Sequence, residues 1–160
     1  MNIEIAKLLD SNFLTYVLEG KNIDENDVDL LERLTDLLAL VNDDTVELVI
    51  TPLLRYEFLR KFGWQHENED FNKFRAAVEE FTWLDISKDV TDLATDLYRL
   101  DKFEAESKGI AKNLEKRKFD VFHFATAKIN GIELLSNDKH IDQMEGLYER
   151  YKTYPTLNLK

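Results

Sequence analysis

Four carboxylates in this sequence stand in surroundings where an acidic side chain is unexpected. Asp10 directly follows a short apolar run, and Asp138 ends the Ser136-Asn137-Asp138 segment that follows another. Glu57 and Asp120 are each flanked by aliphatic and aromatic residues. An ionised carboxylate removed from water costs several kcal/mol unless it is paired or bound to a metal. Because the chain has 32 acids in 160 residues, acid spacing alone indicates little, and these apolar contexts single the four out.

The chemistry available to such a set follows from its charge. Carboxylates brought to one place repel one another unless a cation neutralises them. Hard oxygen ligands suit Mg²⁺ or Mn²⁺, which keep several bound waters and bind phosphate oxygens directly. A metal held in this way orients and deprotonates water and stabilises charge on a phosphoryl group. The four acids together predict a divalent-metal site that supports phosphodiester hydrolysis without a protein nucleophile.

Each of these acids also has a structural explanation that the sequence leaves open. Strand ends favour Asp as a turn or cap residue, which accounts for two of the four. The other two lie one helical turn from basic residues, with which they can form ion pairs. The basic neighbours are Lys116 and Arg117 before Asp120, and Arg60 and Lys61 after Glu57.

The elements that must position these acids are indicated by the apolar pattern. Short apolar runs bounded by turn residues predict strands at residues 3–9, 46–51, 83–86 and 132–135. Apolar residues at three- and four-residue steps, together with Pro52, Gly63 and Ser87 as boundaries, predict helices between them. These helices are expected at residues 24–41, from 52 towards Gly63, at 70–81, from 87 through 100, at 119–129 and at 142–151. A short edge strand is expected near residues 156–159.

Strands that alternate with helices predict an α/β fold with three layers, α/β/α, around a mainly parallel sheet of four to five strands. In such sheets ligands bind at the carboxyl ends of the strands. Asp10 and Asp138 are expected at those ends, and Asp10-Ser11-Asn12 is expected to form a turn. Two strand ends and two adjacent helices can therefore bring all four carboxylates to one rim of the sheet.

Composition limits the class of protein. With 160 residues and 44% apolar composition, the chain is expected to form a single domain over residues 1–160. No apolar run approaches the roughly 18 residues of a membrane span, so no membrane association is expected. The absence of cysteine excludes disulfides and thiolate chemistry and fits a reducing compartment, for which the cytoplasm is the expectation.

The net charge of −11 opposes broad phosphate binding, because basic surfaces normally supply most of the affinity for nucleic acids. One short segment before the predicted helix at 119–129 is basic. Its candidates for contact with RNA phosphates are Lys112, Lys116, Arg117 and Lys118. A charge run of this kind is also typical of a solvated helix face.

The order and context of these motifs resemble the PIN-domain family, in particular toxin ribonucleases of the VapC type. The resemblance covers most of the chain. Its carriers are LLDSN at 8–12, ITPLLRYE at 50–57, FD at 119–120, ATA at 125–127, Gly131, and LLSND at 134–138.

The resemblance implies a parallel-sheet fold, an Mg²⁺- or Mn²⁺-binding acid cluster and endonuclease activity on RNA. The residues that match the family's catalytic and metal-binding acids are Asp10, Glu57, Asp120 and Asp138. Asn12 and Ser136 occupy positions where the family often has a small polar residue that supports the metal site, and Asp142 is a candidate additional acid. The family also implies a homodimer and a protein antitoxin, and an acidic surface suits an antitoxin with basic side chains.

Two other functions are compatible with parts of the sequence. Phosphotransfer enzymes of the haloacid-dehalogenase type use a strand-end Asp as nucleophile and a second Asp two positions later. Here the second position is Asn12, which disfavours that chemistry. A second alternative is a catalytically silent interaction module that keeps the fold, because fold does not fix function. A nuclease assay with divalent metal separates this alternative from the ribonuclease.

Overall fold

A computed structural model describes residues 5–20, 24–111, 114–136 and 140–154 of the chain. The chain forms two compact units. Unit 1 comprises residues 1–86 and 130–137, and unit 2 comprises residues 87–129 and 138–160. The edge strand expected near residues 156–159 lies outside the described residues.

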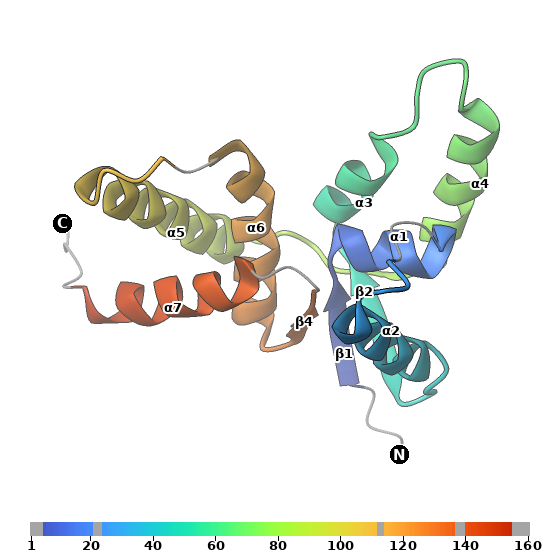
Figure 1. Cartoon of the computed structure of the whole chain (residues 1–160), viewed down its shortest axis with the longest axis horizontal. Helices are drawn as coiled ribbons and strands as arrows, with labels where there is room; N and C mark the ends of the chain where they lie inside the picture. Colours follow the sequence, from blue (N-terminus) through green and yellow to red (C-terminus); the bar gives the residue numbers. More distant parts are fainter. Residues whose placement is uncertain (1–4, 21–23, 112–113, 137–139, 155–160) are drawn as a thin grey trace. The chain divides into compact units, whose positions relative to one another are not determined.

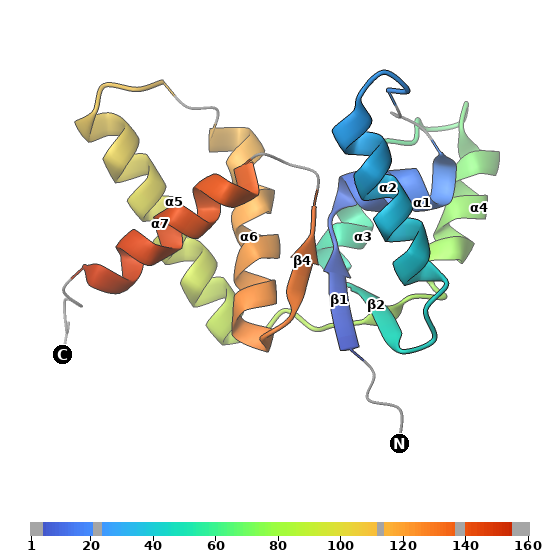
Figure 2. The same ribbon diagram turned by 60° about the horizontal axis from the view of Figure 1, so that its bottom comes forward.

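Unit 1 is built on a four-stranded, all-parallel sheet with the strand order β3-β2-β1-β4. Strands β2, β1 and β4 are labelled in Figures 1 and 2. Its strands are β1 (Ile5–Leu9), β2 (Val46–Ile50), β3 (Thr82–Trp83) and β4 (Glu133–Leu135). Its helices are α1 (Ser11–Glu19), α2 (Val28–Val41), α3 (Pro52–Leu59) and α4 (Asn68–Val78). Helix α1 packs on α3, α3 on α4, and α2 on β2.

The register of the sheet aligns the carboxyl ends of three strands. Leu8 of β1 pairs with Val49 of β2, and Leu9 pairs with Leu135 of β4. Parallel strands that end together place the residues after them at one edge of the sheet. The buried ends of β1 and β2, with Leu8 and Ile50 fully shielded from solvent, anchor that edge in the core of unit 1.

Two helices of unit 1 begin directly after these strand ends. Asp10 caps α1 by accepting a hydrogen bond from the Phe13 N–H at 2.9 Å. Thr51 caps α3 by accepting from the Leu54 N–H at 3.1 Å, and Pro52 occupies the first turn, where its missing N–H removes no helical bond. Both strand-to-helix junctions are therefore fixed by a side chain of the junction itself.

Unit 2 consists of three helices, α5 (Lys88–Ser107), α6 (Leu114–Asn130) and α7 (His140–Thr153) (Figure 1). Tyr151 of α7 donates to Asp96 of α5 at 2.8 Å. Arg150 donates through Nε to both carboxylate oxygens of Glu104, at 2.9 and 3.0 Å. Lys128 of α6 pairs with a glutamate of α7 at 2.9 Å. Helix α7 is thus tied by polar contacts to both of the other helices.

The α/β class with a mainly parallel sheet is confirmed, and the number of strands lies within the expected four to five. The expected turn at residues 10–12 is wrong, because Ser11 and Asn12 begin helix α1. Helix α6 begins at Leu114, so the basic run from Lys116 to Lys118 belongs to the helix rather than preceding it. The single domain over residues 1–160 stays a prediction. No helix in the described part of the chain is long and apolar enough to cross a membrane.

Candidate active site

Asp10 is held at the carboxyl end of β1 by contacts on each side. Its side chain is 8% exposed, and one carboxylate oxygen caps α1 through the Phe13 N–H. The other oxygen accepts a hydrogen bond from the Ser136 hydroxyl. The backbone N–H of Asp10 also donates to the Leu135 carbonyl at 3.1 Å. The carboxylate of Asp10 is therefore oriented by both β4 and α1.

Glu57 of α3 is brought to the same corner of unit 1 by Ser11. The Ser11 hydroxyl donates to Oε1 of Glu57 at 2.7 Å. Ser11 directly follows Asp10 in the chain, and α1 packs on α3. Glu57 is thus hydrogen-bonded to the residue that directly follows Asp10.

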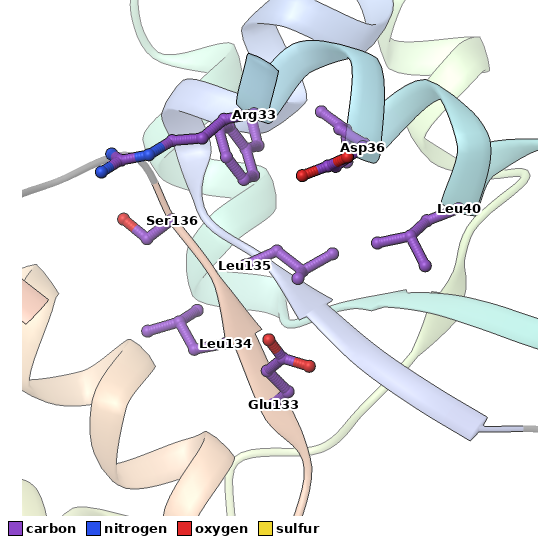
Figure 3. Close-up of a pocket in the computed structure, with 9 residues that line it drawn as sticks. Arg33, Asp36, Leu40, Glu133, Leu134, Leu135 and Ser136 are labelled. Atoms are coloured by element: carbon purple, nitrogen blue, oxygen red, sulfur yellow. The ribbon is translucent and has the colours of Figure 1, made fainter. Parts of the chain in front are cut away.

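Two pockets of unit 1 border this corner. One, of about 470 Å³, is lined from α1 by Ser11, Asn12 and Thr15 and from the α3 side by Glu57, Phe58, Arg60 and Lys61. The other, of about 290 Å³, lies between β4 and α2 (Figure 3). Leu135 of β4 and Ser136, the residue after the strand, line one side, and Arg33 and Asp36 of α2 line the other. The serines that touch Glu57 and Asp10 therefore also face open space.

The cations beside the larger pocket have their own contacts. Lys61 pairs with Glu19, donates to the Thr15 hydroxyl at 3.2 Å and lies 4.4 Å from the centroid of the Phe58 ring. The Arg60 guanidinium lies over the Tyr56 ring at 5.8 Å. The pocket next to Glu57 consequently has a basic side as well as an acidic one.

Asp120 belongs to α6 in unit 2, where it is half-buried and its Oδ2 oxygen is inaccessible to solvent. The basic neighbour one turn earlier, Arg117, is 6% exposed and donates to Gln143 of α7. Lys118 pairs with Glu115 at 2.7 Å. The proposed role of Asp120 in a metal site stays a prediction, as do the predicted RNA contacts of Arg117 and Lys118.

The remaining predicted residues divide by where they lie. Asn12 is exposed and lines the larger pocket, and Asp142 is exposed in the first turn of α7. Asp138, Lys112 and the side chain of Lys116 lie outside the described residues. In the ranges that the structure describes, no three His, Asp or Glu side chains gather closely enough to hold a metal by themselves. The described site is thus the pair Asp10 and Glu57 with its serines.

Ser11 is the contributor to this site that the sequence did not reveal. A serine after a strand-end acid is an ordinary helix-start residue, and no spacing rule connects it with a glutamate in a later helix. Its helical position could have been inferred from the apolar pattern of residues 13–18, which ends at Gly20 with φ of +64°. Its bond to Glu57 depends on the packing of α1 against α3.

Comparison with known proteins gives one family and one fold. The family model of the PIN domain matches residues 7–147. A chain in the crystal structure of VapBC2 from Rickettsia felis, bound to a DNA fragment from their promoter, is structurally similar with a TM-score of 0.52. It is 16% identical in sequence, and the alignment covers 87% of this chain and 92% of that chain. No curated protein sequence gives a significant match. The family match and the parallel sheet confirm the PIN-like fold class expected from the sequence.

Proposed function

The chain belongs to the PIN-domain family, and from this premise we propose that it is a metal-dependent endoribonuclease that hydrolyses RNA phosphodiester bonds. The observation that carries the proposal is the corner at which Ser136 donates to Asp10 and Ser11 donates to Glu57. A buried strand-end carboxylate beside a second carboxylate, each oriented by a hydroxyl, is an arrangement suited to binding a hard cation.

The metal ligands in this proposal are Asp10, Glu57, Asp120 and Asp138, which are also the catalytic residues. The donor set fits Mg²⁺ or Mn²⁺ because it consists of carboxylate oxygens, with the smaller polar groups Asn12 and Ser136 close to the pair in unit 1. When bound, such an ion supplies an activated water and stabilises charge on the phosphoryl group. Asp142 is proposed as an additional acid that supports the set.

The chain's own residues do the positioning. The hydroxyl of Ser136 fixes one oxygen of Asp10, and the hydroxyl of Ser11 fixes one oxygen of Glu57. Fixing one oxygen of a carboxylate also sets the direction of the other. Burial of Asp10 at 8% exposure keeps water from competing for these bonds, and the capping bond from Phe13 ties the carboxylate to α1. The site is therefore preorganised before any ligand arrives.

We also propose that the chain is the toxin of a type II toxin-antitoxin pair that acts in the cytoplasm and forms a homodimer. The similarity to a chain of VapBC2 supports this placement. An antitoxin with basic side chains would complement the net charge of −11. Lys112, Lys116, Arg117 and Lys118 remain the proposed contacts with RNA phosphates.

The test is cleavage of labelled single-stranded RNA by the full chain with added Mg²⁺ or Mn²⁺. We expect cleavage by the wild type and none after chelation with EDTA. Asp10→Asn and Asp120→Asn should lose more activity than the about 10–100-fold expected for a residue that only supports a ligand. Glu32→Gln is the matched control, because Glu32 is an exposed acid of α2 and undergoes the same change from carboxylate to amide.

Circular dichroism of each variant separates loss of the site from loss of the fold. A folded Asp120→Asn variant that cleaves as fast as the wild type would remove Asp120 from the site. Wild-type chain that cuts no RNA under any metal condition would favour the catalytically silent interaction module.

A further inference from the structure

The segment from Thr51 to His66 has a charge opposite to that of the chain as a whole. It contains the basic residues Arg55, Arg60 and Lys61 and a single acid, Glu57, whereas the whole chain has a net charge of −11. Arg55 lies two residues before the proposed metal ligand Glu57, and Arg60 and Lys61 lie three and four residues after it. Arg55 pairs with Glu79 and Lys61 with Glu19, but the segment itself has more basic than acidic residues, which favours contact with phosphate groups in an otherwise acidic chain.

Exposed aromatic rings accompany these cations. Tyr56 is 56% exposed and Trp64 is 88% exposed. Tyr56 lies on α3, and Arg60, four residues later, is the residue that follows the end of the helix. The Arg60 guanidinium carbon lies 5.8 Å from the centroid of the Tyr56 ring. Burying a large aromatic side chain is favourable, and an exposed one does not gain this free energy. A binding partner that covers Trp64 would therefore gain affinity from it.

The backbone that carries Trp64 is held in a tight turn. Gln65 has φ of +70°, a conformation that side chains other than glycine rarely adopt. The His66 N–H donates to the Trp64 carbonyl at 3.0 Å, which closes a three-residue turn. Gln65 is the one non-glycine residue with positive φ in the described ranges. Strain of this kind tends to accumulate at functional positions.

The cations of this segment reach the proposed active site directly. Arg60 and Lys61 line the pocket of about 470 Å³ that Glu57 and Asn12 also line. A chain of nucleotides that contacts Arg60 with a phosphate therefore lies beside the carboxylate of Glu57. Stacking on aromatic rings and phosphate contacts with cations are the two means by which proteins bind single-stranded nucleic acid without reading its sequence.

We propose that Tyr56, Arg60, Lys61 and Trp64, here called the α3 surface, bind single-stranded RNA and lead it to Glu57. Bases stack on Trp64 and Tyr56, and phosphates contact Arg60 and Lys61. This inference rests on the proposed ribonuclease function and adds the surface that receives the substrate. A second copy of the chain is a poorer occupant, because a two-fold contact would bring the two basic segments together.

Tryptophan fluorescence tests the proposal directly, because the chain has two tryptophans, Trp64 and Trp83. In the Trp83→Phe variant, emission reports on Trp64 alone. We expect a single-stranded RNA, added in EDTA so that it is not cut, to quench this emission. The reciprocal Trp64→Phe variant should show little quenching, and a fully paired RNA duplex should quench Trp64 far less, since its bases are already stacked.

Fluorescence anisotropy of labelled RNA measures how much each side chain of the α3 surface contributes to the affinity for RNA. Trp64→Ala should weaken binding about tenfold, within the range found for loss of one stacked base, whereas Trp64→Phe should retain most of the affinity. Arg60→Gln should reduce the slope of log affinity against log salt by about 0.7, the value for one phosphate contact on a single strand. Phe103→Ala is the matched control, because Phe103 is a 57% exposed aromatic residue of unit 2.

Unchanged affinity in both Trp64→Ala and Tyr56→Ala, with no quenching of Trp64, would overturn the inference. Emission of Trp64 that changes with protein concentration in the absence of RNA, and not with RNA, would assign the surface to contact between copies of the chain. Cleavage separates this inference from the proposed function. Quenching without cleavage in any metal would retain the RNA surface and refute the nuclease, and cleavage without quenching would do the reverse.

Discussion

Ser136 connects the last strand of the sheet to the carboxylate of Asp10. The sequence identified Asp10 and Glu57 because acids are unexpected after an apolar strand or within an apolar helix, and the structure places both at one corner of unit 1. The resemblance to the PIN-domain family also indicated Ser136, at a position where the family often has a small polar residue. Ser11 was not identified, because its partner Glu57 is defined by the packing of two helices and not by local sequence.

The Ser136→Ala variant tests whether this hydroxyl orients Asp10. Removing the donor leaves the Asp10 carboxylate without the bond that fixes its second oxygen. We expect cleavage of RNA to fall about 10–100-fold, and the Mn²⁺ concentration for half-maximal rate to rise, as is typical when a residue supporting a metal ligand is lost. Ser107→Ala is the control, since Ser107 is exposed at the end of α5. Equal rates in both variants would mean that Ser136 has no part in the site.

At the scale of elements, the boundaries that the sequence predicted well are those with strong local signals. Pro52 begins α3, and Ser87 caps α5 as expected. Helix α1 was missed because its strongest start signal, Asp10, was interpreted as a turn residue and a ligand, although the structure shows it capping the helix. The Asp10 carboxylate thus caps α1, accepts a hydrogen bond from Ser136 and is a proposed metal ligand. A sequence pattern alone does not distinguish the capping role from the ligand role.

The bond between α5 and α7 gives a pH-dependent prediction for unit 2. The hydrogen bond from Tyr151 to Asp96, with burial as a smaller cause, raises the pKa of Tyr151 from 10.0 to about 12. A raised pKa means that folding favours the protonated phenol. Its stabilising contribution is complete below the unfolded value of 10.0 and is lost as the pH rises towards about 12.

Tyr151→Phe, compared with the wild type by urea unfolding, should lower the free energy of unfolding by about 1 kcal/mol at about pH 8. The difference between the two proteins should shrink at about pH 11, because the unfolded wild type then gains by releasing the phenol proton. The comparison cancels the titration of groups common to both proteins. If the difference in free energy of unfolding stayed constant or grew from about pH 8 to about pH 11, the hydrogen bond to Asp96 would not favour the protonated phenol of Tyr151.

At the scale of the whole molecule, the sequence predicted the fold class and left the assembly of the site open. Alternating strands and helices sufficed for a parallel α/β sheet, because each element carries its own periodicity. The family match over residues 7–147 relates segments that lie far apart in the sequence, which local patterns do not do. The net charge of −11 concealed the basic segment around α3, since a sum over the chain hides where its charges lie.

The proposal assigns the carboxylates of Asp10, Glu57, Asp120 and Asp138 as the ligands of a divalent cation. Each of these side chains is then required for full affinity for the cation. This requirement is stricter than activity alone, because a nuclease contaminant can cut RNA but cannot bind metal to this chain.

The most direct test is therefore Mn²⁺ binding to the full chain. Electron paramagnetic resonance measures the binding as the decrease in the signal of free Mn²⁺. We predict saturable binding by the wild type and by the control Glu32→Gln. We predict marked weakening in each of the single variants Asp10→Asn, Glu57→Gln, Asp120→Asn and Asp138→Asn. Wild-type chain that takes up no Mn²⁺, or folded single variants that bind it as tightly as the wild type, would contradict the account.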